Sequence, residues 1–156
     1  MEIVYREATK SDIETLINLR LEYLISDRGS LSEKEKNQIT DQLINYLGRN
    51  IDETFTAILA EINGEIVSTA YLSISEKPAN PSFITGKIGT ILNVYTKPQF
   101  RKQGISTKVL AMLIDKAKKY NISKIELSAT EMGKSLYERL GFREKQSKYT
   151  NMQLYI

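Results

Sequence analysis

A strand, a helix and a second strand follow one another over residues 87–129, and this order restricts the fold more than any other feature of the sequence. Residues 87–96 are apolar on both faces in their middle, as expected of a central strand. Residues 104–120 carry an apolar side chain at every fourth position, which predicts an amphipathic helix. Residues 124–129 alternate between apolar and polar and predict the second strand. Such a connection is right-handed and makes its two strands parallel.

A hairpin precedes this unit and adds antiparallel pairing. Residues 55–62 and 65–74 are rich in strand-forming side chains, and Asn63-Gly64 between them is the dipeptide best suited to a two-residue turn. Shorter signals predict the remaining elements: a strand over 3–7, helices that open with Ser-x-x-Glu boxes at Ser11 and Ser32, a short helix over 133–140 and a last strand over 148–156. The sequence therefore predicts an α/β fold, with helices on a mixed sheet, in a single domain over residues 1–156.

The composition excludes several kinds of chemistry. The chain has no histidine, cysteine or tryptophan, so imidazole acid–base catalysis, thiolate nucleophiles, disulfides and thiolate metal sites are ruled out. The 22 basic and 19 acidic side chains give a net charge of +3, which is too small to indicate nucleic-acid binding. No apolar run approaches the roughly 20 residues needed to cross a bilayer, and the first residues lack the apolar core of a signal peptide. The expectation is a cytoplasmic protein without membrane contact.

The loop between the central strand and the following helix concentrates positive charge. The stretch from Val94 to Ile114 contains no acid and four cations, Lys97, Arg101, Lys102 and Lys108. A cation at the start of a helix opposes the helix dipole at a cost of about 0.3–1 kcal/mol. Gly104, at the turn into the helix, lets a ligand approach the free N–H groups of the first turn. The pattern fits a phosphate cradle, and it also fits a solvated basic loop.

Two motifs carry a resemblance to a known family. Neither a Gly-x-x-x-x-Gly-Lys-Ser/Thr nor a Gly-x-Gly-x-x-Gly segment occurs, which disfavours nucleoside-triphosphate and dinucleotide sites. Arg101-Lys-Gln-Gly104-Ile-Ser106 resembles the Arg/Gln-x-x-Gly-x-Gly/Ala acyl-CoA signature of the GNAT superfamily of N-acetyltransferases. About 30 residues later, Leu136-Tyr-Glu-Arg-Leu-Gly-Phe142 is similar to that family's Leu-Tyr-x-x-x-Gly-Phe element. Ser106 and Thr130 depart from the pattern, which usually has Gly or Ala and Asn there.

The resemblance covers essentially the whole chain and implies a fold. That fold is a mixed, mostly antiparallel sheet of six or seven strands with helices on both faces. The strands predicted over residues 87–96 and 124–129 would splay apart around the acyl-CoA. Folds of this kind commonly form homodimers, but the sequence does not define a dimer surface.

The resemblance also implies which residues hold acetyl-CoA as the acyl donor, with no metal. Backbone groups of Val94, Tyr95 and Thr96 would bind the pantetheine arm, with Thr130 and Tyr137 beside it. The pyrophosphate would be bound by the loop residues Arg101, Lys102, Gln103, Gly104, Ile105 and Ser106. The backbone N–H near Val94 would stabilise the oxyanion that develops when an amine attacks the thioester.

Tyr137 is the candidate acid, because a phenol with a pKa of about 10 can protonate a thiolate whose thiol has a pKa of about 8.5. Without the motif, the same residue would be interpreted as a packed aromatic side chain. The base stays open, since some family members have a glutamate where this chain has Thr90. Glu126 and Glu131 are candidates that also fit ordinary surface carboxylates, and Asn93 could orient the amine.

The sequence therefore predicts an N-acetyltransferase that moves an acetyl group from acetyl-CoA to a primary amine, directly and within a ternary complex. Two alternatives stay open, a non-catalytic acyl-CoA sensor and a transferase of another acyl group. A nucleic-acid-binding module is disfavoured, because no stripe of aromatic residues accompanies the cations. The acceptor amine is not identified.

Overall fold

The turn at Asn63-Gly64 forms as the sequence predicts, with φ angles of 50° and 81°. It joins β2 (Phe55–Ile62) to β3 (Glu65–Glu76) in antiparallel register. Because the type of turn sets the register, alternate residues of β2 face opposite sides of the sheet. The hairpin therefore fixes the two faces on which the helices pack.

The rest of the chain adds three strands and four α-helices to this hairpin. A computed structural model describes residues 1–156 and has one sheet, in the order β1-β2-β3-β4-β5, in which only β4 and β5 are parallel. The remaining elements, in chain order, are β1 (Val4–Glu7), η1 (Lys10–Asp12), α1 (Ile13–Arg28), α2 (Glu33–Asn50), β4 (Lys87–Thr96), η2 (Pro98–Phe100), α3 (Ile105–Ala117), η3 (Lys118–Tyr120), β5 (Lys124–Glu126) and α4 (Lys134–Arg139). The mixed sheet of the sequence prediction is thus confirmed.

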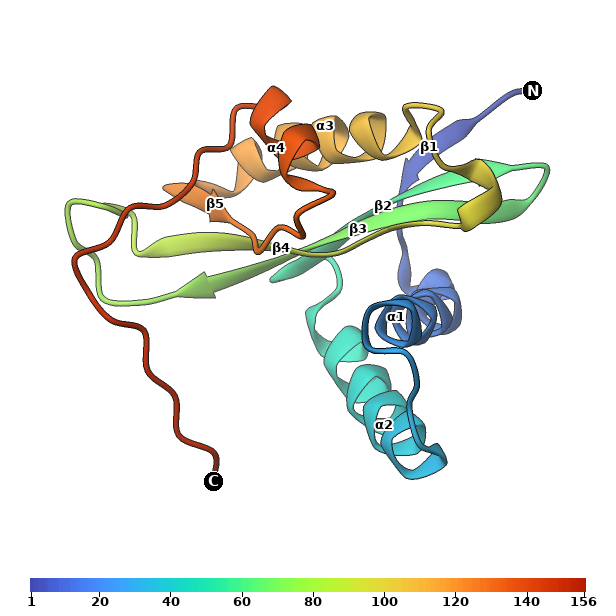
Figure 1. Ribbon diagram of the computed structural model, residues 1–156, viewed down its shortest axis with the longest axis horizontal. Coiled ribbons are helices and arrows are strands. Elements are labelled where there is room, and N and C mark those ends of the chain that lie inside the picture. Colours follow the sequence, from blue (N-terminus) through green and yellow to red (C-terminus); the bar gives the residue numbers. More distant parts are fainter.

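Helices cover both faces of the sheet, with α3 and α4 on one side and α1 and α2 on the other (Figure 1). On the α3 side, the helix buries Ile105, Val109 and Leu113 against β2, β3 and β4. On the other side, Leu16 of α1 and Leu47 of α2 are almost fully buried over the sheet. Two separate apolar clusters therefore hold the sheet between two layers of helix. None of the helices combines the length and the apolar character needed to cross a bilayer.

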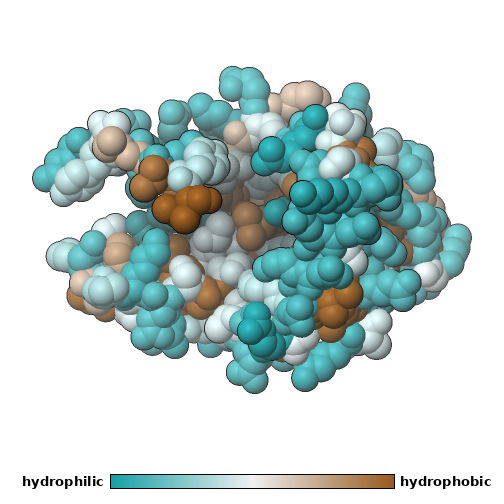
Figure 2. All heavy atoms as spheres, turned by 90° about the horizontal axis from the view of Figure 1, so that it is seen from below, coloured by the Kyte–Doolittle hydropathy of each residue, from teal (hydrophilic) through white to brown (hydrophobic).

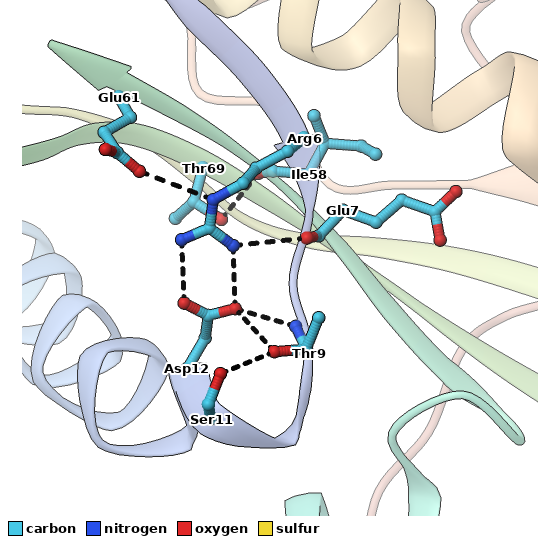
Figure 3. A network of polar contacts seen from close by, with 8 residues as sticks. All are labelled: Arg6, Glu7, Thr9, Ser11, Asp12, Ile58, Glu61 and Thr69. Carbon is cyan, nitrogen blue, oxygen red and sulfur yellow. Dashed lines mark hydrogen bonds and ion pairs between the residues drawn. The ribbon is translucent and has the colours of Figure 1, made fainter. Parts of the chain in front are cut away.

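Asp12, at the start of α1, is held by Arg6 of β1. The two carboxylate oxygens of Asp12 accept hydrogen bonds from Nη1 and Nη2 of Arg6 at 2.8 and 2.9 Å, and one oxygen also accepts the backbone N–H of Thr9 at 2.7 Å (Figure 3). These hydrogen bonds, led by those from Arg6, hold the pKa of Asp12 below its ordinary value, although burial acts in the opposite direction. The pair of hydrogen bonds between Arg6 and Asp12 fixes the first helix to the edge of the sheet.

Two predicted features at the ends of the chain are wrong. The sheet has five strands rather than six or seven, because the predicted last strand over 148–156 pairs with nothing. Residues 143–156 are exposed and lead away from the sheet (Figure 1), so their alternating pattern buries no surface. At the other end, the cap of the first helix uses the Asp12 carboxylate and the Thr9 N–H instead of a box opened by Ser11. The box at Ser32 is confirmed.

Replacing Asp12 by asparagine should lower the free energy of unfolding by about 1.5–3 kcal/mol near neutral pH, the usual contribution of hydrogen bonds to a charged group. The folded pKa of Asp12 lies below the unfolded value of about 3.9, so the contribution is complete above that value. It should be lost as the pH falls through the folded pKa, when the carboxyl binds a proton in both states. Urea unfolding at about pH 7 and about pH 3 measures the difference. Asp115→Asn, in an exposed pair with Lys118, is the control and should have almost no effect.

Candidate active site

The last six residues of β4 have a strand partner on one side only. Pairing with β5 runs from Ile88 to Thr90, and Thr90 lies opposite Glu126, the last residue of β5. Pairing with β3 continues as far as Thr96. From Ile91 onward, the backbone groups of β4 that point away from β3 therefore meet no strand. The expected splay between these two strands is confirmed, and it leaves a free edge of extended backbone.

A β-bulge at Asn93 lies in this free stretch. Leu92 is opposite Tyr71 and Tyr95 is opposite Thr69, so two residues of β4, Asn93 and Val94, oppose one residue of β3. Asn93 has a φ of 54°, in the left-handed region that asparagine tolerates better than most residues. A bulge bends its strand and increases its twist. It therefore accounts for the departure of β4 from β5. The sequence analysis did not predict the bulge, although an asparagine within an apolar strand is its one visible signal.

The loop after β4 presents a row of backbone N–H groups. Lys102 and Gly104 have φ angles of 62° and 78°, which turn the chain sharply into α3. The N–H groups of residues 103–107 have no acceptor within the protein. Successive N–H groups at a helix start, next to residues of left-handed conformation, form a concave site for an anion. The predicted cradle residues Gln103, Gly104, Ile105 and Ser106 are thus brought together.

Three of the four predicted cations remain available to an anion. Arg101 donates from Nε to the carbonyl oxygen of Thr96 at 2.8 Å, which holds its guanidinium at the end of β4. Lys102 and Lys108 are exposed and form no ion pair. Lys97, in contrast, pairs with Glu65 at 2.7 Å, which raises its pKa and neutralises its charge locally. The positive charge therefore lies at the start of α3.

A chain of hydroxyl groups fastens this helix start to the sheet. The Thr96 hydroxyl lies 2.7 Å from the hydroxyl of Ser68 on β3 and 2.6 Å from that of Ser106 on α3. Ser68 and Thr96 are buried, so these contacts are shielded from water. Ser106, where the family pattern has Gly or Ala, therefore adds a bond that a smaller residue could not make.

Tyr137 lies on α4 and is half-buried. Burial, with a smaller contribution from nearby Tyr23 of α1, raises the pKa of its phenol above the ordinary value. The ring packs edge-on against Phe142, with ring centroids 6.0 Å apart. A Cβ on Gly133 would lie 3.3 Å from the Tyr137 ring and 3.2 Å from the Thr130 hydroxyl, so the chain approaches both closely. The Thr130 hydroxyl accepts the N–H of Gly133 at 3.1 Å and thus helps to start α4.

The two candidate bases differ in their surroundings. Glu126 pairs with Lys124 at 3.1 Å and with Lys145 at 3.4 Å, and these contacts, the first above all, lower the pKa of its carboxyl. A lowered pKa makes a weaker base. Glu131 is exposed in the turn before α4. Neither carboxylate is therefore buried, as a general base usually is.

Arg20 of α1 lies next to the bulge and was missed by the sequence analysis. Its Nη1 donates to Oδ1 of Asn93 at 3.4 Å, which links the first helix to the bulge of β4. Arg20 also lines a hollow between α1, α2 and the sheet. The contact spans 73 residues of sequence, so no local pattern announces it.

Comparison with known proteins places these features in a family. Residues 14–142 match the model of the acetyltransferase (GNAT) family. A curated relative, glucosamine 6-phosphate N-acetyltransferase from Arabidopsis thaliana, is 27% identical over 117 residues, which are 75% of this chain and 74% of the relative.

Solved structures show the same likeness. A predicted acetyltransferase with acetyl-CoA from Clostridium acetobutylicum has a TM-score of 0.82 and 31% identity, covering 97% of this chain and 96% of its own. A GCN5-related N-acetyltransferase from Ralstonia eutropha has a TM-score of 0.78 and 24% identity, covering 97% of this chain and 99% of its own. The second match, at this identity, shows similarity of fold.

Replacing Gly104 by alanine should destabilise the protein by about 1–2 kcal/mol, because a Cβ is disfavoured at its positive φ although it would meet no neighbouring atom. Gly48→Ala is the matched control. Gly48 lies within α2, also with open space around it, so alanine should there stabilise by roughly 0.5–1 kcal/mol. Urea unfolding of the two variants should therefore give changes of opposite sign. A stabilising Gly104→Ala change would contradict the turn conformation described above.

Proposed function

Because the chain belongs to the GNAT acetyltransferase family, we propose that it transfers an acetyl group from acetyl-CoA to a primary amine, directly and within a ternary complex. The observation that carries the proposal is the continuity of two donor surfaces. The free edge of β4 ends at Thr96, and the unpartnered N–H row of residues 103–107 begins seven residues later. A long ligand with an amide-containing arm and a pyrophosphate suits that sequence of surfaces.

The residues present fit such a donor. The backbone of Val94, Tyr95 and Thr96 would pair with the pantetheine arm as an added strand does, and Thr130 would lie beside it. The loop from Arg101 to Ser106 would hold the pyrophosphate, with Lys102 and Lys108 supplying charge. When bound, acetyl-CoA supplies an acetyl group activated as a thioester. The protein then needs to position the amine, stabilise negative charge near the Val94 N–H and supply one proton.

Tyr137 is suited to supply the proton. Its raised pKa keeps the phenol protonated at neutral pH, which a proton donor requires. Tyr137 and Val94 of β4 both pack against the apolar cluster on the α3 side of the sheet, which supports a position of the phenol close to the free edge of β4. A packing role alone would need no hydroxyl, so the hydroxyl itself is the group to test.

The proposal predicts that acetyl-CoA raises the melting temperature of the protein by mass action, since it binds the folded state alone. Arg101→Ala should reduce this shift, because it removes a cation from the start of α3 and the bond to the Thr96 carbonyl. Thermal unfolding at increasing acetyl-CoA measures both effects. Lys119→Ala, which removes an exposed charge from η3, is the control and should keep the full shift. The absence of any shift at millimolar acetyl-CoA would contradict the proposed donor site.

Tyr137→Phe should lower kcat by roughly 10²–10⁴, the usual contribution of general acid catalysis, with little change in the acetyl-CoA thermal shift. The rate is measured as thiol release in the presence of an accepted amine. Tyr149→Phe, in the exposed C-terminal segment, is the control and should leave the rate unchanged. A loss below threefold for Tyr137→Phe would exclude it as the acid. Ligand binding without thiol release from any amine would instead favour an acyl-CoA sensor.

A further inference from the structure

A hollow of about 160 Å³ lies between α1, α2 and the sheet, on the face opposite α3. Figure 2 views the molecule from this side and shows a recess with hydrophobic residues in it. Eight residues line the hollow, and Arg20 is the only charged one. Leu43, Leu47, Phe55 and Leu92 provide most of its apolar wall. Because an apolar cavity of about 150 Å³ holds a benzene-sized molecule, this hollow has room for one apolar side chain.

An unpartnered amide lies beside the charged wall of the hollow. Asn93 is 3% exposed, and its Oδ1 accepts the hydrogen bond from Arg20. Its Nδ2 is the one buried side-chain nitrogen or oxygen in the protein without a hydrogen-bond partner. A buried donor without an acceptor is costly, and native proteins rarely retain one without a reason. A ligand oxygen would supply the missing acceptor.

The charge of Arg20 is also uncompensated. No carboxylate of the protein lies within ion-pair distance of its guanidinium, which stands 5.8 Å from the ring centre of Tyr23. The neighbouring Tyr71 phenol donates to the carbonyl oxygen of Leu16, so it offers the guanidinium no negative charge. Arginine stays charged at any ordinary pH and binds carboxylates through two parallel hydrogen bonds. Arg20 and Asn93 together thus form a group of N–H donors with no carboxylate in ion-pair contact.

We propose that the acceptor is a small primary amine that carries a carboxylate and an apolar side chain, as leucine, methionine and phenylalanine do. The inference rests on the acetyl transfer proposed above and names the substrate class for the same site. Arg20 and the Asn93 Nδ2 bind the carboxylate, while the hollow takes the apolar side chain. The bulge that places Asn93 also places the neighbouring Val94 N–H, so carboxylate binding holds the amine near the reacting carbonyl.

The reaction balances without a further reagent. The substrate ammonium first releases one proton to solvent, and the neutral nitrogen then forms a bond to the acetyl carbon. The carbon–sulfur bond breaks, and the sulfur takes the proton of the Tyr137 phenol. The second proton of the nitrogen restores the phenol. The products are an N-acetyl amino acid and coenzyme A.

The wall of the hollow distinguishes this class from an amino sugar phosphate such as glucosamine 6-phosphate, on which the Arabidopsis relative acts by its name. A sugar needs hydrogen-bond partners for several hydroxyls. Apart from Arg20, the wall offers Gln42, the Tyr71 phenol already engaged with Leu16, and a Tyr46 phenol already within 3.1 Å of the Ser73 hydroxyl. An apolar side chain suits this lining better.

Matched pairs of amines test the proposal. Thiol release from acetyl-CoA is measured with leucine against 3-methylbutylamine and with phenylalanine against phenethylamine, which differ only by the carboxylate, and with glucosamine 6-phosphate. The carboxylated member of each pair should have a kcat/KM about tenfold to a hundredfold higher, the effect of hydrogen bonds to a charged group. Titration calorimetry of leucine and of 3-methylbutylamine into the coenzyme A-bound protein measures the difference between their affinities without turnover.

Two variants test whether Arg20 and Asn93 cause the preference for the carboxylated amine. Arg20→Gln should remove at least tenfold of the leucine kcat/KM and change that of 3-methylbutylamine less than threefold. Asn93→Asp replaces the free donor by an anion. It should also lower the kcat/KM of leucine more than that of 3-methylbutylamine. Arg28→Gln, which removes a cation from the exposed end of α1, is the control and should change the kcat/KM of neither substrate. The acetyl-CoA thermal shift of each variant shows that it is folded.

The outcomes separate this inference from the proposed function. Equal turnover of the carboxylated and decarboxylated amines, or preferred turnover of glucosamine 6-phosphate, would overturn the substrate class and leave acetyl transfer intact. An equal loss of kcat/KM for both members of a pair in Arg20→Gln would also overturn the substrate class. The absence of thiol release with every amine would overturn both proposals.

Discussion

The bulge at Asn93 is the constraint on which the rest of the structure depends. A regular β4 would run beside β5 along its length, and its backbone groups would all be used within the sheet. With one extra residue opposite Ala70, β4 turns away, and pairing with β5 ends at Thr90. A free backbone edge is thereby left between two strands of one sheet. Because α3 begins shortly after this edge ends, the helix start and the edge form one continuous donor surface.

Buried polar side chains help apolar packing to hold the irregular region. Of the six buried polar or charged residues in the protein, four lie on β3 and β4 around the bulge: Ser68, Thr69, Asn93 and Thr96. A bulge removes ladder hydrogen bonds, and a hydroxyl group can satisfy a carbonyl near it, as that of Ser68 does for Tyr95 of β4. The Thr69 hydroxyl donates to the carbonyl oxygen of Ile58 on β2. Satisfied buried networks are rigid, because every alternative arrangement leaves a polar group without a partner. The free Nδ2 of Asn93 is the exception, which is why it directs attention to a ligand.

Local sequence signals predicted the elements whose geometry is decided locally. The Asn63-Gly64 turn requires positive φ at both residues, and the strands over 55–62 and 87–96 have the predicted bounds. The start of α3 was visible in its cations and in Gly104. The bulge was not, since a shift of register depends on the pairing of β4 with β3. Nor was Arg20, whose contact with Asn93 joins distant parts of the chain. The strand over 148–156 failed because alternation predicts a strand only where an edge is available to receive it.

The lack of histidine and of a suitable carboxylate leaves proton removal from the amine as the remaining chemical requirement. No carboxylate lines the hollow, and Glu126, tied to two lysines, is a weak base. The guanidinium of Arg20, which donates to Asn93 beside Val94, would however disfavour an ammonium ion close to it, because two positive charges repel. A bound amine would therefore have a lower pKa than in water and release its proton to solvent on entry. In the proposed site, Arg20 would thus favour both the carboxylate of the acceptor and the neutral form of its amine, and a dedicated base would then be unnecessary.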